Sequence, residues 1–433
     1  MNGLFRVEDT LANKISYYHL MLLLASLPFN MFYSHIILVS YALHTLIHLN
    51  KKQVKGVFSF RTVALQSVFF VTVLSTIYTI NKPEAFNEWG KQITILLIPV
   101  LFCLNPIDIK KYRNNLFLAF SLVCTGTIAY LYLDAFITIK HYHLPWSNIL
   151  TGAFTNHNFS EPIDMHATFF SMQVLLALTY LLTLIIKEAR FYNRLLYLFC
   201  CLVLTAGLIQ LSSKSILAVL LITLNIAIPL FLLNGRARLK FMLTAGCFSV
   251  LAIVAVLNTN VFRERYVTEL KIDMTRQTVD EVSDSRLARW GVTAGLIKKS
   301  PFIGYGAGSE IGLLQDGFYT HKLYDSYLNK LNTHSEYLSI TLKSGLIGLL
   351  IYLATLAFGF KRAILQKDTV FFTFMLLIAV VSFSENLLDV DKGIIFYAFF
   401  FSFFAFPHKK QEKVATTDRI KSARIKADDL VVA

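Results

Sequence analysis

The chain has 433 residues, of which 55% are hydrophobic and 16% are charged, and its mean hydropathy is +0.56. Ordinary soluble domains carry about 25% charged residues, so this composition excludes a single water-soluble domain and predicts an integral membrane protein. The net charge of +14 does not indicate nucleic-acid binding, because cations in a membrane protein concentrate in the cytoplasmic loops.

Apolar segments of membrane-spanning length follow one another along the chain and predict an all-α membrane protein with about twelve transmembrane helices. They cover residues 16–31, 33–49, 62–80, 91–105, 116–136, 167–187, 195–211, 216–233, 241–258, 335–359, 369–385 and 393–407. The predicted organisation has four parts: nine spans in 1–258, a large loop with short helices in 259–333, three spans in 334–407, and a basic tail in 408–433.

The placement of lysine and arginine predicts that both chain ends lie in the cytoplasm. With the N-terminus inside, the short inner loops are rich in cations and the short outer segments hold only Lys82, Lys91, Lys140, Lys214 and Lys392. The large loop then lies outside, and its cations do not contradict this because long loops translocate regardless of charge. The basic tail is expected to contact anionic lipid.

Lys214 interrupts an apolar stretch that runs from residue 195 to residue 233, and serines lie on both sides of it. A charge at this depth is costly, so the residue is either a snorkelling lysine in a tight turn or part of a functional site. In the functional interpretation, the ammonium lies at the outer surface between two helix ends and suits a phosphate.

The segment SDSRLARWGVTAGLIKKSP, residues 283–301, predicts an amphipathic helix in the large loop. Arg286 and Arg289 share one face with Thr293. This face is either a solvated basic surface or a pair of guanidinium groups for a lipid diphosphate, since a guanidinium fork holds two oxygens. The glycine-rich loop that follows, PFIGYGAGS, contains Tyr305 and can bring backbone N–H groups close to an anion.

The stretch THSEYLSITLKSGLIGLLIYL, residues 333–353, predicts a membrane helix that begins with a histidine. His334, Gly345 and Gly348 fall on one helical stripe, where the glycines would let a neighbouring helix pack closely. A histidine at a helix end is more often structural than catalytic. The alternative is a base that accepts a proton from a sugar hydroxyl.

Two other features lack an assigned role in the sequence. Glu385, in SFSENLLDVDKG, is a costly charge near the outer end of a late span, and it has no assigned partner. A short outer loop contains the histidine-rich segments HYHLPW, NHNF and EPIDMH. The five cysteines all lie in apolar runs without metal-ligand spacing, so no metal site is predicted.

The spacing His334-Ser335, nine residues, Gly345, two residues, Gly348 resembles the H-[N/S/Q]-x9-G-x-x-G signature of the O-antigen ligase and polymerase family, which comprises bacterial polytopic membrane glycosyltransferases. The segment SRLARW followed by SPFIGYGAG resembles the arginine segment of that family. Members commonly have arginine where this chain has Lys214. Lysine keeps the charge but loses the bidentate fork.

The resemblance implies a GT-C-like fold in the bacterial inner membrane and transfer of a glycan from undecaprenyl diphosphate to a lipid A–core or other acceptor hydroxyl at the periplasmic face, with inversion. The implied partners are this donor, the acceptor and membrane lipids; no nucleic acid, metal or other cofactor is implied. The implied catalytic residues are His334, Arg286 and Lys214, and the implied substrate contacts are Arg289, Ser335 and Tyr305.

Two alternatives stay open. A polymerase of the same family would pass the glycan to a second lipid-linked repeat and shares the donor chemistry, so the motif does not separate it from a ligase. A transporter of lipid-linked sugars belongs to another class. It is disfavoured because transporters often have two related halves and broken helices near the membrane midplane, whereas the charged candidates here gather at one surface.

Overall fold

The computed structural model describes residues 4–49, 53–258, 260–275 and 284–406, and within these ranges the chain is helical without strands. The first helices are α1 (Leu11–Ser26), α2 (Met31–Ile47), α3 (Val54–Val57), α4 (Phe60–Ser75), α5 (Lys82–Leu104), α6 (Ile109–His141), α7 (His157–Ser160), α8 (Ala167–Lys187), α9 (Phe191–Leu211), α10 (Lys214–Ile222), α11 (Ile228–Leu232) and α12 (Gly235–Asn258). They are followed by α13 (Asn260–Arg263), α14 (Glu269–Asp273), α15 (Arg286–Lys299), α16 (Glu310–Thr320), α17 (Tyr324–Leu328), α18 (Glu336–Gln366), α19 (Thr369–Val381) and α20 (Asp391–Ala405), with a short 3-10 turn, η7 (Leu387–Asp389), before α20. The basic tail predicted for 408–433 lies outside the described residues.

Among the described helices, six stretches are long and apolar enough to cross a membrane: Ile109–His141, Ala167–Lys187, Phe191–Leu211, Lys214–Leu232, Gly235–Ala255 and Glu336–Gln366. The shorter apolar helices α2, α4 and α19 add to this character. Each of the twelve predicted spans overlaps a helix. The prediction of an all-α multi-pass membrane protein is therefore confirmed, whereas the number of crossings and the side on which the large loop lies stay predictions.

The centre of the helix bundle is α20, whose phenylalanine side chains are almost completely buried. Phe404 stacks on Phe371 of α19 with ring centroids 4.8 Å apart, and Phe400 stacks on Phe117 of α6 at 5.9 Å. Lipid tails are as apolar as these rings, so close packing between the rings holds the helices together in a membrane.

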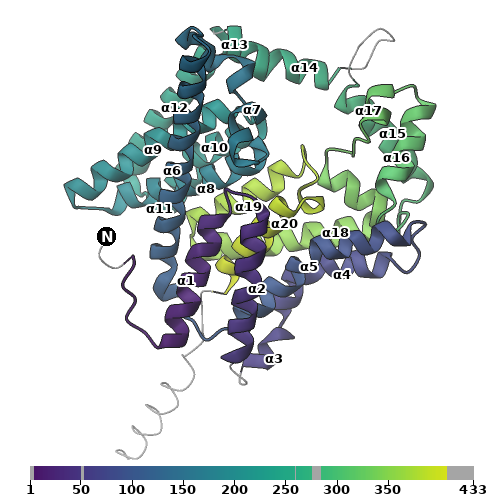
Figure 1. The fold of residues 1–433 in the computed structure, drawn as a ribbon, viewed down its shortest axis with the longest axis horizontal. Coiled ribbons are helices and arrows are strands. Elements are labelled where there is room, and N and C mark those ends of the chain that lie inside the picture. Colours follow the sequence, from purple (N-terminus) through teal and green to yellow (C-terminus); the bar gives the residue numbers. More distant parts are fainter. Residues whose placement is uncertain (1–3, 50–52, 259, 276–283, 407–433) are drawn as a thin grey trace, which may run out of the picture.

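Helices α15, α16 and α17 form a compact group, which we call the α15–α17 group. It has a small apolar core of Val292, Leu314, Phe318 and Leu323, completed by Leu342 of α18. Helices α13 and α14 extend from the end of α12 toward this group (Figure 1). The α15–α17 group is therefore packed against α18, close to the end where His334 lies.

The long helix α18 is interrupted at Gly345, where φ is +64°. The loop before α16 lies in this break: Tyr305 N–H donates to the carbonyl of Leu342 at 3.0 Å, and Leu346 N–H donates to the carbonyl of Pro301 at 2.8 Å. A Cβ on Gly345 would lie 2.1 Å from the Phe302 backbone. The close approach at Gly345 is therefore made by a loop rather than by a neighbouring helix, because the loop supplies the hydrogen bonds that the broken helix loses.

Gly348, one turn further along α18, faces α4. A Cβ there would lie 3.3 Å from Cγ1 of Val71 and 2.5 Å from Cβ of Ser344. The two glycines of the motif thus meet different neighbours: Gly345 the loop, and Gly348 a helix.

Candidate functional site

His334 lies between α17 and α18, two residues before the helix that the sequence predicts it to begin. Its φ of +46° is uncommon for a side chain other than glycine, and its N–H donates to Oδ1 of Asn332 at 3.0 Å. The imidazole Nδ1 faces Oε2 of Glu385 at 3.5 Å, and 28% of the side chain is exposed. No hydrogen bond within the described residues engages the other ring nitrogen, Nε2.

The backbone around His334 is held by residues 382–386, which follow α19 and which we call the 382–386 turn. Asn386 Oδ1 accepts hydrogen bonds from Ser335 N–H at 2.9 Å and from the Thr333 hydroxyl at 3.0 Å. Glu336 N–H donates to two carbonyls of the turn at 2.9 and 3.2 Å. The first N–H groups of a helix have no partner inside it, so the turn satisfies donors that α18 cannot. Ser335, a predicted substrate contact, is buried in this arrangement.

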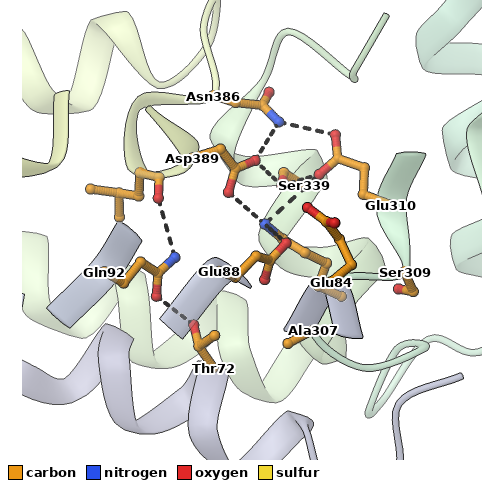
Figure 2. Close-up of polar contacts among 12 residues, drawn as sticks. Thr72, Glu84, Glu88, Gln92, Ala307, Ser309, Glu310, Ser339, Asn386 and Asp389 are labelled. Atoms are coloured by element: carbon orange, nitrogen blue, oxygen red, sulfur yellow. Dashed lines mark hydrogen bonds and ion pairs between the residues drawn. The ribbon is translucent and has the colours of Figure 1, made fainter. Parts of the chain in front are cut away.

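A buried charge network continues from Asn386. Its Nδ2 donates to Glu310 at 3.0 Å and to Asp389 at 2.9 Å, and Figure 2 shows these carboxylates converging with Glu88 from three separate elements. Nζ of Lys343, on α18, lies 2.7 Å from Asp389, 3.4 Å from Glu88 and 3.9 Å from Glu310. Burial raises the pKa of Asp389, but the ammonium outweighs this and the net direction is downward. Lys343, Glu88, Glu310, Asp389 and Asn386 are called the Lys343 network below.

A pocket of ≈ 160 Å³ lies beside the Lys343 network. Its lining residues include Glu84, Lys91, Gln92 and Asn332, together with carboxylates of the network. Gln92 Nε2 donates to the Leu388 carbonyl at 3.2 Å, which ties α5 to η7 (Figure 2). Because Asn332 also accepts the N–H of His334, the pocket adjoins the histidine segment.

The helix that carries Arg286 is tied to the segment that carries His334. Trp290, one turn further along α15, donates Nε1–H to the carbonyl of Thr333 at 2.9 Å, next to His334. Residues four apart share a helix face, so Arg286 lies on the same side as this contact. Its Nε is 3.6 Å from Oδ2 of Asp273, at the end of α14.

Glu385 is the carboxylate that these groups share. Burial raises its pKa, but the contact with His334 and the charges of His166, His334 and Arg286 together lower it below its usual value. His166 precedes α8, its ring centroid is 4.2 Å from that of His157, and burial lowers its pKa to about 4. The segments NHNF and EPIDMH contain this histidine pair, but the sequence does not say which element faces it.

Arg289 is turned inward. Only 5% of the residue is exposed, and Nε and Nη1 have no hydrogen-bond partner among the described residues. Thr293, on the same face, is fully buried, so this face is neither a solvated basic surface nor the side that would lie on a membrane. Burial lowers the pKa of Arg289, and the neighbouring charge of Arg286 lowers it further. The carboxylates of Asp273, Asp284 and Asp325 act against this lowering of the pKa. Two guanidinium nitrogens nevertheless lack an acceptor, which is costly in a buried position and suits an incoming anion.

Lys214 opens α10 after a break at Ser212, whose φ is +50°. Its Nζ lies 3.2 Å from Oε2 of Glu269 on α14, and the same oxygen is 2.5 Å from Nη1 of Arg265. Within the described ranges, no ion pair or hydrogen bond joins Lys214 to Arg286 or His334. Lys214 and Arg286 are linked only indirectly: Glu269 and Asp273 are one helical turn apart on α14, and Glu269 pairs with Lys214 and Arg265 while Asp273 pairs with Arg286.

Tyr305 and its glycine loop serve the packing. The Tyr305 hydroxyl donates to the carbonyl of Leu296 on α15 at 3.0 Å, and Gly306 N–H donates to the carbonyl of Lys343 at 2.8 Å. Cβ atoms at Gly306 and Gly308 would lie 2.3 Å from backbone atoms of Thr79 and the α5 helix. The amide N–H groups of residues 305 and 306 are thus engaged by α18.

Metal ligation finds no support in the part of the chain that the structure describes, where no group of three or more His, Cys, Asp or Glu side chains is arranged to hold an ion. The five cysteines lie in helices, and no disulfide joins them within the described residues. The Lys343 network was missed by sequence reasoning, although a lysine inside an apolar run is a recognisable signal of a paired or functional charge.

Residues 195–353 match the family model described as O-antigen ligase. The match extends from α9 into α18 and contains Lys214, Arg286, Arg289 and His334. No match was found among curated proteins. Residues 195–353 are thus similar to the O-antigen ligase family, in a chain whose described part has several helices long and apolar enough to cross a membrane.

Proposed function

We propose that the protein is a membrane glycosyltransferase that moves a glycan from undecaprenyl diphosphate to a hydroxyl of lipid A–core or another acceptor, at the periplasmic face of the bacterial inner membrane. The observation that supports this proposal is the contact between His334 and Glu385, a carboxylate on which the charge of Arg286 also acts, together with the bond that ties the helix of Arg286 to Thr333 through Trp290. Displacement of a diphosphate by a hydroxyl requires a base and a group that binds the anion.

The proposed reaction is a direct displacement. The acceptor oxygen attacks the anomeric carbon, the bond from that carbon to the diphosphate oxygen breaks, and undecaprenyl diphosphate leaves with the electron pair. The hydroxyl proton passes to Nε2 of His334, the ring nitrogen that faces away from Glu385. The configuration at the anomeric carbon is inverted, because attack and departure take place on opposite faces.

The departing diphosphate gains negative charge, and the arginines of α15 are the proposed groups that offset it. Arg289 supports this role because its guanidinium is buried and has unpaired N–H groups. Arg286 is held by only a 3.6 Å contact with Asp273, which a diphosphate can replace. Lys214 would supply a third positive charge after its contact with Glu269 is released.

A transfer assay in vitro tests the proposal. Purified protein receives a lipid-diphosphate-linked glycan and either lipid A–core or no added acceptor, with EDTA present. We expect glycan on lipid A–core with the wild type and at least about a 100-fold lower rate with His334→Ala, since general base catalysis contributes about 10²–10⁴. His321→Ala, which changes an exposed histidine of the large loop, is the matched control.

The same assay separates the alternatives. Longer lipid-linked chains without lipid A–core would identify a polymerase of the same family. Undiminished transfer by His334→Ala would refute the role proposed for this histidine, and loss of transfer with EDTA would refute a metal-independent reaction.

A further inference from the structure

Glu385 is a half-buried carboxylate in the turn that follows α19. Only 14% of its side chain is exposed, and Oε2 lies 3.5 Å from Nδ1 of His334. A carboxylate near a membrane is retained only where a partner or a function offsets its cost. Among the described residues, His334 is the side chain with which it forms an ion-pair contact.

We propose that Glu385 is a positioning residue that keeps the proton of neutral His334 on Nδ1, so that Nε2 presents its lone pair to the acceptor hydroxyl. This inference rests on the proposed function. The partner of one imidazole nitrogen decides which nitrogen carries the proton, and a carboxylate accepts but does not donate. When Nε2 takes up the acceptor proton, the ring becomes an imidazolium and the carboxylate stabilises its charge.

The distance between the two side chains is set by the backbone. Glu336 N–H donates to the Glu385 carbonyl at 3.2 Å, and Asn386 accepts the N–H of Ser335 at 2.9 Å. The residues on either side of the dyad are therefore fixed to each other. Nδ1 of His334 is buried and has no hydrogen-bond partner among the described residues, and the carboxylate of Glu385 is 3.5 Å away from it. Catalytic contacts are often longer before substrate binds.

Other charged groups face Glu385, but they do not replace His334. Arg286 approaches from α15 and is paired with Asp273, while His157 and His166 approach from the segment before α8. Burial keeps His166 uncharged near neutral pH, because it lowers the pKa to about 4. His334 is consequently the group whose imidazole ring the Glu385 carboxylate can orient.

The first test reads the histidine directly. Protein labelled with 15N-histidine is placed in lipid bilayers, and solid-state NMR measures the imidazole nitrogens, with His334→Ala identifying the His334 signals by their loss. We expect the Nδ1–H tautomer in the wild type and a shift toward Nε2–H in Glu385→Ala. An unchanged tautomer would overturn the inference.

The second test is kinetic. Glu385→Gln keeps the shape but removes the charge, and we expect kcat to fall about 10–100-fold with the donor KM unchanged, as for groups that orient a reactive side chain. Glu385→Asp should recover part of the loss, and Glu161→Gln, an exposed acid before α8, is the matched control. In the His334→Ala background, Glu385→Gln should cost nothing further, whereas an additional full loss would indicate a merely structural role.

The two tests fail in different ways. Unchanged imidazole signals in Glu385→Ala refute the positioning role alone and leave the proposed function standing. Undiminished transfer by His334→Ala refutes the proposed function and, with it, any catalytic purpose of Glu385.

Discussion

Lys343 and Arg289 are two cations with the same degree of exposure, 5% each, but their direct contacts differ. Lys343 lies within 4 Å of three carboxylates, whereas Arg289 has two nitrogens without a hydrogen-bond partner among the described residues. A cation whose partners are already present holds the fold together. A cation that lacks them is costly until an anion arrives. The comparison thus separates a structural charge from a candidate binding charge without reference to sequence motifs.

The largest expected effect is on Lys343. Lys343→Met leaves three buried carboxylates without their cation, and removal of one partner from a buried ion pair costs about 3–5 kcal/mol. We expect a strong fall in the unfolding temperature of the detergent-solubilised protein, with Lys82→Met, an exposed lysine of α5, as the control. Equal melting of the two variants would contradict a structural role for Lys343.

His166 extends the comparison to a group that the fold keeps uncharged. Its pKa is about 4 in the folded protein and about 6.5 when unfolded, so between these pH values the unfolded state binds more protons and stability rises with pH. Up to about 3 kcal/mol is lost as pH falls from 6.5 to 4. His166→Gln should make the melting temperature depend less on pH over this range, whereas His321→Gln should leave the pH dependence unchanged.

The effect of Arg289→Met on stability should be opposite to that of Lys343→Met. Stability should hold or rise, because an unpaired buried charge is removed, and transfer should fall about 10–100-fold through lost contacts with the diphosphate. Arg289→Lys should recover little, since lysine lacks the fork. Lys298→Met, on the exposed side of the same helix, is the control. If Arg289→Met melts at a much lower temperature but transfers glycan at the normal rate, Arg289 is a structural charge rather than a binding charge.

The smallest expected effect is on α14. Glu269→Gln and Asp273→Asn release Lys214 and Arg286 from carboxylates that are partly exposed, so each contact is worth up to about 1 kcal/mol. We expect the donor KM to fall a few-fold, measured against Asp316→Asn on α16 as the control. A donor KM that rises instead would show that α14 assists donor binding rather than competing with it.

Local patterns in the sequence were enough to predict the membrane character and the apolar segments that form helices, because hydropathy and charge are properties of neighbouring residues. The same patterns were enough to single out the candidates His334, Arg286 and Lys214. The motif spacing was also sufficient to predict the resemblance to the O-antigen ligase family, and residues 195–353 match the model of that family.

The tertiary structure decided which distant segments meet. It placed a loop in the break at Gly345, turned Arg289 inward, gave Glu385 its partner and gathered the acids around Lys343. None of these follows from spacing along the chain, because the segments that meet are far apart in sequence. A buried charge is stabilised only by the groups that folding brings to it.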